Sequence, residues 1–334
     1  MTNFLHDISI SNFKSLKDCK ITDCKRINLF IGRPNVGKSN ILEALSSFSI
    51  PFLKENSSKD LTQLIRLESE TELFYNGNYN DPARIETNKG FVQFSYEKEN
   101  GLQVKIDTGR DLGMYTIDDK LNVRYKRNDD YVSPIRKYSF QPHTQQRKTH
   151  SRYLIPPFGI NMFNMIEKNE LLKKEISALF AEYRLNLVFD RASQSLKIMQ
   201  AEDANEIFLV PYNSIANTLQ RIIFFKTAVA SSDNCVLLFE APETHSFPPY
   251  MTHITQEMIH KKDNQYFVVT HSPFILNDFL ENILDELAVY MVHYENHETQ
   301  LKRLTDKELH EIYQFGVDLF TNSESYKYFS FRQE

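Results

Sequence analysis

The sequence predicts an α/β fold in which a mostly parallel sheet carries helices on both faces, joined to an antiparallel β subdomain and a helical insertion. Two observations lead to this prediction. In the last third of the chain, short apolar runs alternate with helical patterns, which is typical of parallel strands connected by helices. Residues 91–127 instead alternate apolar and polar side chains, which is typical of antiparallel strands with one solvent-exposed face.

The composition is that of a globular protein with a large core, since 41% of the 334 residues are hydrophobic and 25% are charged. The net charge of −5 argues against a chain that wraps nucleic acid, so any such contact must come from a local patch. No secretory signal or membrane-spanning run is visible, and we expect a cytoplasmic protein. The three cysteines (Cys19, Cys24, Cys235) fit neither a disulfide framework nor a zinc site.

The chain is expected to form a single head made of three segments. In the first, 1–50, residues 5–22 form two short strands around a turn, an apolar strand at 25–32 ends in a glycine, and 38–50 has helical spacing. The second, 51–210, is an inserted lobe. The third, 211–334, is an α/β lobe. Its expected strands are 236–240, 265–270 and 287–295, and its expected helices are 218–231, 251–262 and 273–282.

The inserted lobe begins with a polar stretch rich in turn signals, followed by the antiparallel hairpins. Residues 128–160 are expected to form a basic loop. Five basic residues cluster there with three aromatic ones: Arg136, Lys137, Arg147, Lys148 and Arg152, with Tyr138, Phe140 and Tyr153. Such a loop would suit nucleic acid or a partner, but an ordinary solvated loop has the same composition and is favoured. Residues 161–187 are expected to be helical. Three short strands follow, at 185–190, 195–200 and 207–212.

One motif predicts the chemistry. The eight residues from Gly32 to Ser39 match G-x-x-x-x-G-K-S, between an apolar strand and a helical pattern. The glycines let successive backbone N–H groups face one anion at the start of the helix. Lys38 is expected to reach the β- and γ-phosphates of a nucleotide, and the Ser39 hydroxyl to ligate Mg²⁺. The expected nucleotide contacts are Gly32, Asn35, Val36, Gly37, Lys38, Ser39 and Asn40.

Two strand ends downstream supply further polar groups. The apolar strand 236–239 is followed by Glu240, which suits the second metal contact of a phosphate-loop protein. The next acid, Glu243, comes three residues later. A second buried strand ends in Thr270 and His271, and this histidine is expected to hydrogen-bond the γ-phosphate.

Taken in order, these segments resemble ABC-type ATPases of the RecF, SMC and OLD group, and in particular compact AAA-family ATPases of bacterial anti-phage defence. The resemblance rests on ISISNFKSLKD, GRPNVGKSN, NSIANTLQRIIFF, VLLFEAPETHSFPP and VVTHSPFIL. It implies an ATP site with Mg²⁺, in which Lys14 also takes part. Lys38 and Ser39 correspond to the Walker A residues, Glu240 to the Walker B acid and His271 to the switch histidine.

The resemblance also implies that two copies close around ATP. Residues 213–220, including Ser214 and Asn217, stand where such ATPases contact the γ-phosphate of the opposite subunit. This region contains no glycine, unlike the usual signature, and Ser214 is expected to cap the following helix. A second difference lies at Ala241, where relatives have the glutamate that polarises the attacking water.

Three interpretations of Ala241 stay open. It is an engineered substitution that traps the ATP state, which we favour; or the protein is a natural ATP switch with little turnover; or Glu243 serves instead. General-base assistance supplies ~10²–10⁴-fold in rate, so its loss should impair hydrolysis.

No Toprim-like or HNH-like acid and histidine spacing follows Leu287, so we expect no nuclease activity in this chain. The resemblance therefore implies an ATPase subunit that assembles on ATP and regulates a separately encoded effector, such as a nuclease, in anti-phage defence. Two alternatives remain: a RecF/SMC-like DNA-maintenance ATPase that clamps DNA, and a scaffold that binds ATP without hydrolysing it.

Overall fold

The computed structural model describes residues 2–109, 111–125, 131–181, 183–203 and 206–322. The chain divides into two compact units. The second unit is formed by 138–233 and 242–261, and the first by the remainder of the chain. These units do not follow the three segments expected from the sequence, because the second unit combines parts of 51–210 and 211–334. The three-segment division therefore stays a prediction.

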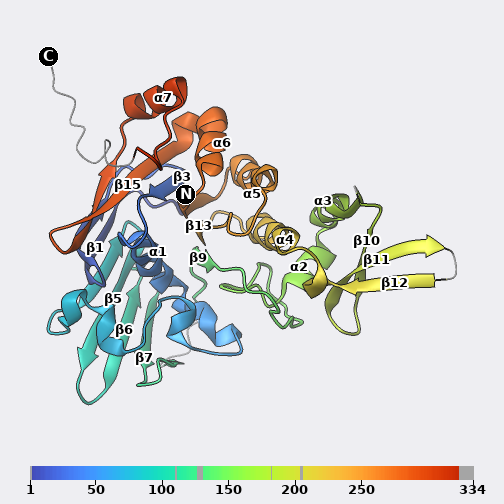
Figure 1. Ribbon diagram of the computed structural model, residues 1–334. Coiled ribbons are helices and arrows are strands. Elements are labelled where there is room, and N and C mark those ends of the chain that lie inside the picture. The colour runs from blue at the N-terminus through green and yellow to red at the C-terminus, as the bar shows by residue number, and fades with distance from the viewer. Residues whose placement is uncertain (1, 110, 126–130, 182, 204–205, 323–334) are drawn as a thin grey trace. The chain divides into compact units, whose positions relative to one another are not determined.

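The first unit contains a six-stranded sheet in which the inner strands are parallel (Figure 1). Its order is β16 (Glu298–Arg303), β15 (Leu287–Glu295), β3 (Ile27–Ile31), β14 (Gln265–Val269), β13 (Val236–Glu240) and β9 (Ile135–Tyr138). β15, β3, β14 and β13 run parallel, and β16 pairs antiparallel with β15. All of β3 and β14 is buried, as expected for strands covered on both faces.

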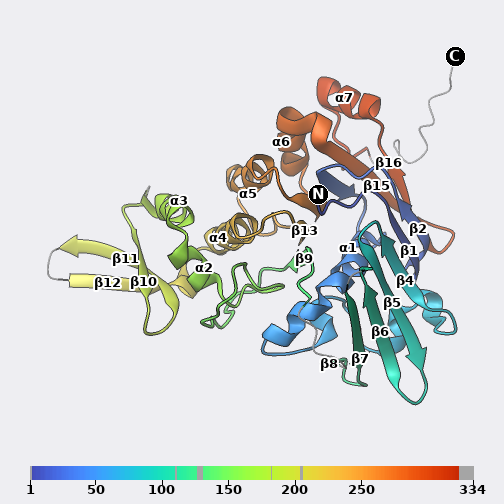
Figure 2. The same ribbon diagram turned by 180° about the vertical axis from the view of Figure 1, so that it is seen from behind.

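Helices cover the two faces of this sheet. The core that contains Ile41 and Leu42 of α1 (Lys38–Ser46) also includes Leu238 and Val269 from the sheet. Because neighbouring residues of a strand point to opposite faces, Phe239 and Val268 face the other side. α6 (Pro273–Ile283) packs against β15, and Figures 1 and 2 show it on the side away from α1. The predicted parallel sheet with helices on both faces is confirmed.

A seven-stranded antiparallel sheet completes the core of the first unit. Its order is β2 (Leu16–Ile21), β1 (Ile8–Phe13), β4 (Ala83–Thr87), β5 (Gly90–Glu97), β6 (Gly101–Asp107), β7 (Leu112–Ile117) and β8 (Val123–Tyr125). Every second residue of β6 is buried, so the alternation seen in the sequence corresponds to one covered face. The expected antiparallel subdomain is therefore present, and the N-terminal strands belong to it.

The second unit is helical with a small antiparallel sheet (Figure 2). Its elements are α2 (Met162–Lys168), α3 (Glu170–Ala181), β10 (Asn186–Asp190), β11 (Ser195–Asp203), β12 (Glu206–Pro211), α4 (Asn217–Ala230) and α5 (Pro248–His260). α3 packs on β10, and α4 contacts α2, α3 and α5. Lys226 of α4 pairs with Glu175 of α3 at 2.9 Å and with Glu257 of α5, which links the three helices.

Several elements differ from their predictions. The helix expected at 38–50 ends at Ser46 and continues as a 3₁₀ segment to Glu55, because Pro51 cannot donate a helical hydrogen bond. The helix expected at 161–187 is interrupted at Asn169 and ends at Ala181. β9 lies inside the expected basic loop, of which 128–130 fall outside the described residues. Across the described part of the chain, no helix has the length and apolarity to cross a membrane.

Candidate functional site

The loop from Gly32 to Ser39 joins β3 to α1, and its backbone requires both glycines. A Cβ at Gly32 would lie 2.2 Å from the Val292 carbonyl oxygen. Gly37 precedes α1 with φ of 96°, and a Cβ there would lie 2.0 Å from Thr299 Oγ1. Asn35 is also left-handed, with φ of 62°. The chain thus forms the tight turn that the motif predicts.

The Lys38 ammonium lies against this loop. Its Nζ donates to the carbonyl oxygens of Gly32 at 2.7 Å and Arg33 at 2.5 Å. The residue is only 4% exposed, and this burial lowers the pKa of Lys38 to about 8. An ammonium held by two neutral carbonyls keeps its charge available for an anion placed at the same loop.

Glu240 and His271 end strands whose carboxyl ends lie at the same edge as the loop. Glu240 pairs in register with Val269, and Val269 with Phe30, so β13, β14 and β3 end side by side. The Ser39 hydroxyl lies close enough to the Glu240 carboxylate to help lower its pKa. A hydroxyl and a carboxylate are the hard oxygen ligands that Mg²⁺ takes, and they suit a site in which nucleotide phosphates supply further oxygens. These two residues therefore fit the metal that the motif implies.

Positive charges surround Glu240. Arg66 Nη2 lies 3.0 Å from Glu240 Oε1. Burial raises the pKa of Glu240, but the charge of Lys137, the Ser39 hydrogen bond and Arg66 more than offset it, and the pKa lies below its usual value. The carboxylate is therefore ionised at neutral pH and ready to accept a cation.

Sequence reasoning did not identify Arg66, which connects two carboxylates at this edge. Its side chain is 63% exposed, and its Nε lies 2.6 Å from Glu43 Oε1. Glu43 of α1 is fully buried and also pairs with Lys14 at 2.6 Å. Lys14, expected at the nucleotide, thus reaches the site through Glu43. Arg66 occurs in a stretch without periodicity, so no local signal identified it.

Lys137 corrects the interpretation of 128–160 as one solvated basic loop. It lies in β9, is almost completely buried, and donates to the Leu64 carbonyl oxygen at 2.8 Å. Burial lowers the pKa of Lys137, although Glu240 and Glu43 act in the opposite direction. Arg136 is buried as well, whereas Arg147, Lys148 and Arg152 are exposed. The aromatic residues of this stretch likewise include a buried one, Tyr138, besides Phe140 and Tyr153.

Two other residues expected to contact the nucleotide, Asn40 and Val36, take part in hydrogen bonds that stabilise the loop. Asn40 Nδ2 donates to Ser15 Oγ at 2.7 Å, and Ser15 Oγ lies 2.6 Å from Thr299 Oγ1. Thr299 in turn donates to the Val36 carbonyl oxygen at 3.0 Å. Asn40 and Val36 therefore hold the conformation of the loop through β16, an element that the sequence interpretation did not include.

The two residues expected to support hydrolysis, His271 and Ala241, are less well suited to their expected roles. His271 is exposed just after β14, where the Ser272 N–H donates to Thr270 Oγ1 at 3.0 Å. Ala241 follows Glu240 directly, with φ of 42° and its N–H donating to the Val269 carbonyl oxygen at 2.8 Å. The backbone is thus fixed at the position expected to be catalytic, where the alanine side chain carries no proton acceptor.

Glu243 belongs to the second unit, where it is buried beside Arg221. Burial lowers the pKa of Arg221, and the charge of Glu243 partly opposes this shift. The arrangement favours a structural role for this carboxylate as the counter-charge of a buried guanidinium.

The signature-like segment differs from its prediction in one respect. α4 begins at Asn217 with Ala216 at its N-cap, and no side chain caps it, so the expected Ser214 cap was wrong. Ser214 instead ends a 3₁₀ turn (Tyr212–Ser214), and both Ser214 and Asn217 are exposed. A Ser can cap only from the position directly before the first helical turn, and Ser214 lies two residues too early.

Comparison with known proteins supports the nucleotide-site interpretation. The sequence family described as "AAA ATPase domain" matches residues 4–179. The chain is 25% identical over 191 residues to the DNA replication and repair protein RecF of Leptospira biflexa, covering 54% of this chain and 46% of that protein. RecF of Caldanaerobacter subterraneus is 27% identical over 118 residues, which are 34% of this chain and 31% of the relative. The chain thus spans less than half the length of these relatives.

Solved structures show the same fold. The SmcHead bound to the C-winged helix domain of ScpA has a TM-score of 0.53 at 12% identity, over 90% of this chain and 98% of that one. A Smc head domain bound to the C-terminal domain of ScpA, derived from Pyrococcus furiosus, has a TM-score of 0.50 at 11% identity, over 93% and 99% of the two chains. The fold is that of an SMC-head-like P-loop NTPase.

Proposed function

The chain belongs to the AAA ATPase domain family, and from this premise we propose that it binds Mg-ATP between the loop 32–39 and Glu240 and pairs with a second copy when ATP is bound. The proposed ATP site is supported by the set of residues that meet at the edge of the parallel sheet. There the phosphate loop, Glu240 and His271 follow three adjacent strands, and the Ser39 hydroxyl lies near the Glu240 carboxylate. Sequence separation alone gives no reason for these groups to meet.

The proposed pairing rests on the resemblance of 213–220 to an ABC signature. The exposed start of α4, without a side-chain cap, leaves backbone N–H groups available for an anion. In the proposed pair, this anion is the γ-phosphate of ATP bound to the other copy. His271 would contact the γ-phosphate of its own copy's ATP.

Ala241 makes this form a poor hydrolase in our proposal. The residue cannot orient or deprotonate water, and Glu243 is engaged beside Arg221 in the second unit. The resulting long-lived ATP state would favour the assembled form, which is suited to a subunit that regulates an effector rather than to rapid turnover. That effector, a separately encoded nuclease in anti-phage defence, follows from the family resemblance alone.

One titration tests the ATP site. Mg-ATP added to the purified chain in a calorimeter should give binding heat, and the same titration of Lys38→Ala should lose the heat that comes from the loop 32–39. Light scattering of the wild-type chain should show the mass doubling only when Mg-ATP is present. Absence of both heat and thermal stabilisation by Mg-ATP would overturn the ATP site. Binding without a change in mass would overturn the pairing alone.

The RecF relatives favour a second candidate, an ATPase that clamps DNA. It predicts ATP-dependent duplex binding that weakens steeply with salt. A fluorescent duplex titrated with the chain, with and without Mg-ATP, separates the candidates, because an effector-regulating subunit need not bind duplex DNA. Co-purification of the chain with its natural partners then tests the effector. A scaffold that never hydrolyses ATP is distinguished by the Ala241→Glu variant described below.

A further inference from the structure

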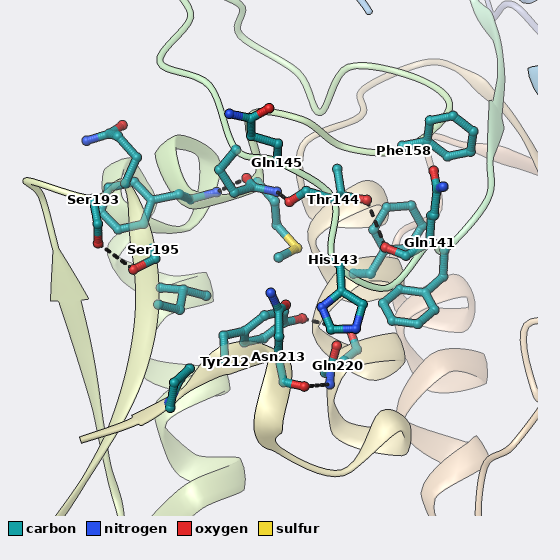
Figure 3. Close-up of a pocket in the computed structure, with 18 residues that line it drawn as sticks. Gln141, His143, Thr144, Gln145, Phe158, Ser193, Ser195, Tyr212, Asn213 and Gln220 are labelled. Atoms are coloured by element: carbon teal, nitrogen blue, oxygen red, sulfur yellow. Dashed lines mark hydrogen bonds between the residues drawn. The ribbon is translucent and has the colours of Figure 1, made fainter. Parts of the chain in front are cut away.

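We propose that a cavity in the second unit binds a nucleobase that carries an exocyclic amino group. The cavity has a volume of about 370 Å³. Figure 3 shows side chains reaching it from the loop at 141–145, from Phe158, from the strand region around Ser193 and Ser195, and from the 3₁₀ turn and α4 with Tyr212, Asn213 and Gln220. The volume falls within the ~300–1,000 Å³ typical of small-ligand pockets.

The lining is polar but carries no permanent charge. Among the residues that the structure describes, no Asp, Glu, Lys or Arg side chain contributes to it. Six amides contribute instead: Gln141, Gln145, Gln146, Gln194, Asn213 and Gln220. An amide carries a donor and an acceptor in one plane, and planar amides form paired hydrogen bonds with the edges of nucleobases. The buried part of the ligand should therefore be neutral and rich in hydrogen-bonding groups.

Two of these amides present buried oxygens that have no hydrogen-bond partner among the described residues. They are Oε1 of Gln220, a residue that is 4% exposed, and Oε1 of Gln194. A buried acceptor without a hydrogen-bond partner destabilises the folded protein. A ligand that donates an N–H to each of the two oxygens would remove this cost.

Hydrogen bonds to the neighbouring backbone determine which atom of each amide lacks a partner. Gln220 Nε2 donates to the Ile215 carbonyl oxygen at 2.9 Å, and Gln194 Nε2 donates to the Arg191 carbonyl oxygen at 2.9 Å. A flip of either amide would place an oxygen against a carbonyl oxygen. Both free atoms are therefore acceptors, and the ligand must bring donors.

Gln146 provides a contrast within the same cavity. Its Oε1 accepts from the Phe163 N–H at 3.0 Å, while its Nε2 donates to the Gly159 carbonyl oxygen at 3.3 Å. This amide is engaged at both ends and holds the loop against α2. Gln194 and Gln220 are engaged only through their nitrogens, which distinguishes recognition groups from a structural one.

Aromatic rings supply the remaining requirement for a base. Phe140, Phe158, Phe163 and Phe224 all contribute to the lining. Phe140 and Phe224 meet edge to face, with ring centroids 5.8 Å apart, so the rings form an ordered apolar wall. Flat aromatic surfaces stack on nucleobases, and stacking is worth ~1–3 kcal/mol per base.

These features together favour an amino-bearing base over a sugar. Sugar hydroxyls donate and accept equally, whereas the two free groups here are both acceptors. Adenine, cytosine and guanine each carry an exocyclic amine that donates twice. Exposed Arg147 and Lys148 directly follow Gln146 in the chain and suit the phosphate attached to such a base. The same base chemistry occurs in a free nucleotide and in single-stranded nucleic acid.

The test uses nucleosides, which lack the phosphates that the loop 32–39 would hold. Adenosine and cytidine, titrated into the full chain and followed by ligand-detected NMR, should bind. Purine riboside, which is adenosine without the amino group, should bind roughly 10-fold more weakly, because the acceptors stay unpaired. The Lys38→Ala variant should bind adenosine unchanged, so failure of the ATP site and failure of this proposal are distinguishable.

Two variants report on the acceptors. Gln194→Met and Gln220→Met remove one acceptor each and should weaken adenosine binding roughly 10-fold. Gln314→Met, on the exposed surface of α7 (Asp306–Phe315), is the matched control and should change nothing. Because Gln220 also bonds to Ile215, melting temperatures of the variants are compared. Gln194→Met decides the result if Gln220→Met unfolds.

Oligonucleotides identify the source of the base. If an eight-nucleotide oligo(dA) binds more than roughly 10-fold tighter than adenosine, the occupant is a nucleic-acid strand, since each added base stacks and each phosphate adds charge contacts. Equal affinities indicate a free nucleotide. The proposal is overturned if adenosine, cytidine and guanosine all fail to bind, if purine riboside binds as well as adenosine, or if only a neutral sugar such as maltose binds.

Discussion

Two groups of residues at one edge of the parallel sheet differ in how completely the chain supplies them. The group expected to hold ATP is preorganised: the loop is fixed by two glycines, Lys38 lies against it, and Ser39 lies near Glu240. The group expected to hydrolyse ATP consists of an exposed His271 and an alanine at the catalytic position. The first group is supported by other elements, whereas the second lacks its proton acceptor.

This difference separates binding from turnover. Phosphate binding needs oriented N–H groups, a cation and a metal-ligand set, all of which follow from backbone geometry and a few fixed side chains. Hydrolysis needs in addition a carboxylate that orients water, and one substitution removes it. The fold can therefore retain a complete ATP site while its rate of hydrolysis is low, which is the state that we propose for this chain.

The largest expected effect comes from restoring the carboxylate. Ala241→Glu should raise ATP turnover by ~10²–10⁴-fold, because a general base then orients the attacking water. Phosphate release at saturating Mg-ATP measures it. The backbone at 241 is already left-handed with φ of 42°, so glutamate meets a conformation that alanine tolerates.

Ala241→Gln is the matched control, since glutamine has nearly the same shape but does not accept a proton. It should leave turnover at the level of the alanine form. Equal rates for the glutamate, glutamine and alanine forms would show that position 241 does not limit hydrolysis, and the scaffold alternative would then be favoured.

The next effect concerns the binding group. Lys38→Ala should weaken Mg-ATP binding by roughly 10²-fold, because it removes a charge-assisted contact to the phosphates that is worth ~1.5–3 kcal/mol. Calorimetry measures the loss. Lys98→Ala removes an exposed ammonium of the same charge outside the loop and should leave the affinity unchanged. A similar loss in both variants would mean that overall charge, and not the loop, attracts ATP.

The sequence predicted the fold around the loop 32–39 well because its signals are local. A strand, a glycine turn and a helix follow one another between residues 27 and 46, and the apolar runs of β13 and β14 indicate burial by themselves. The ends of these strands were enough to place Glu240 and His271 near the loop. The parallel pairing then followed from a general rule about α/β folds.

Long-range contacts had no such signal. Arg66 pairs with Glu240 across 174 positions, and nothing in its neighbourhood is periodic. Lys137 was assigned to a basic loop because composition does not reveal that β9 completes the edge of a sheet. Ser214 was expected to cap α4, but the helix starts two residues too late. Each of these differences arises from tertiary structure that overrides a local preference.

A smaller effect tests the support of the loop. Gly37→Ala should lower the free energy of unfolding by about 2–3 kcal/mol, because the new Cβ adds left-handed strain and displaces Thr299 from Val36. Gly77→Ala has a comparable positive φ of 69° and no atom within 4 Å of its Cβ, so it should cost only about 1 kcal/mol. Urea unfolding compares the two variants. Equal costs would mean that β16 does not support the loop.

The smallest expected effect is a pH dependence of ATP binding. In the free protein burial lowers the pKa of Lys38 to about 8, and bound phosphates must raise it again because they favour the ammonium. Below pH 8 the lysine is charged in both states, so its contribution to the affinity is constant. Above pH 8 binding takes up a proton, so affinity should fall by up to ~10-fold per pH unit. Calorimetry at pH 7, 8 and 9 measures the decline, and repetition in buffers of different ionisation enthalpy counts the proton.

Lys38→Arg stays charged throughout and should show a flat profile. A flat profile for the wild-type chain would mean that the Lys38 ammonium does not change its proton affinity on binding, and the loop would then hold phosphate through its backbone alone.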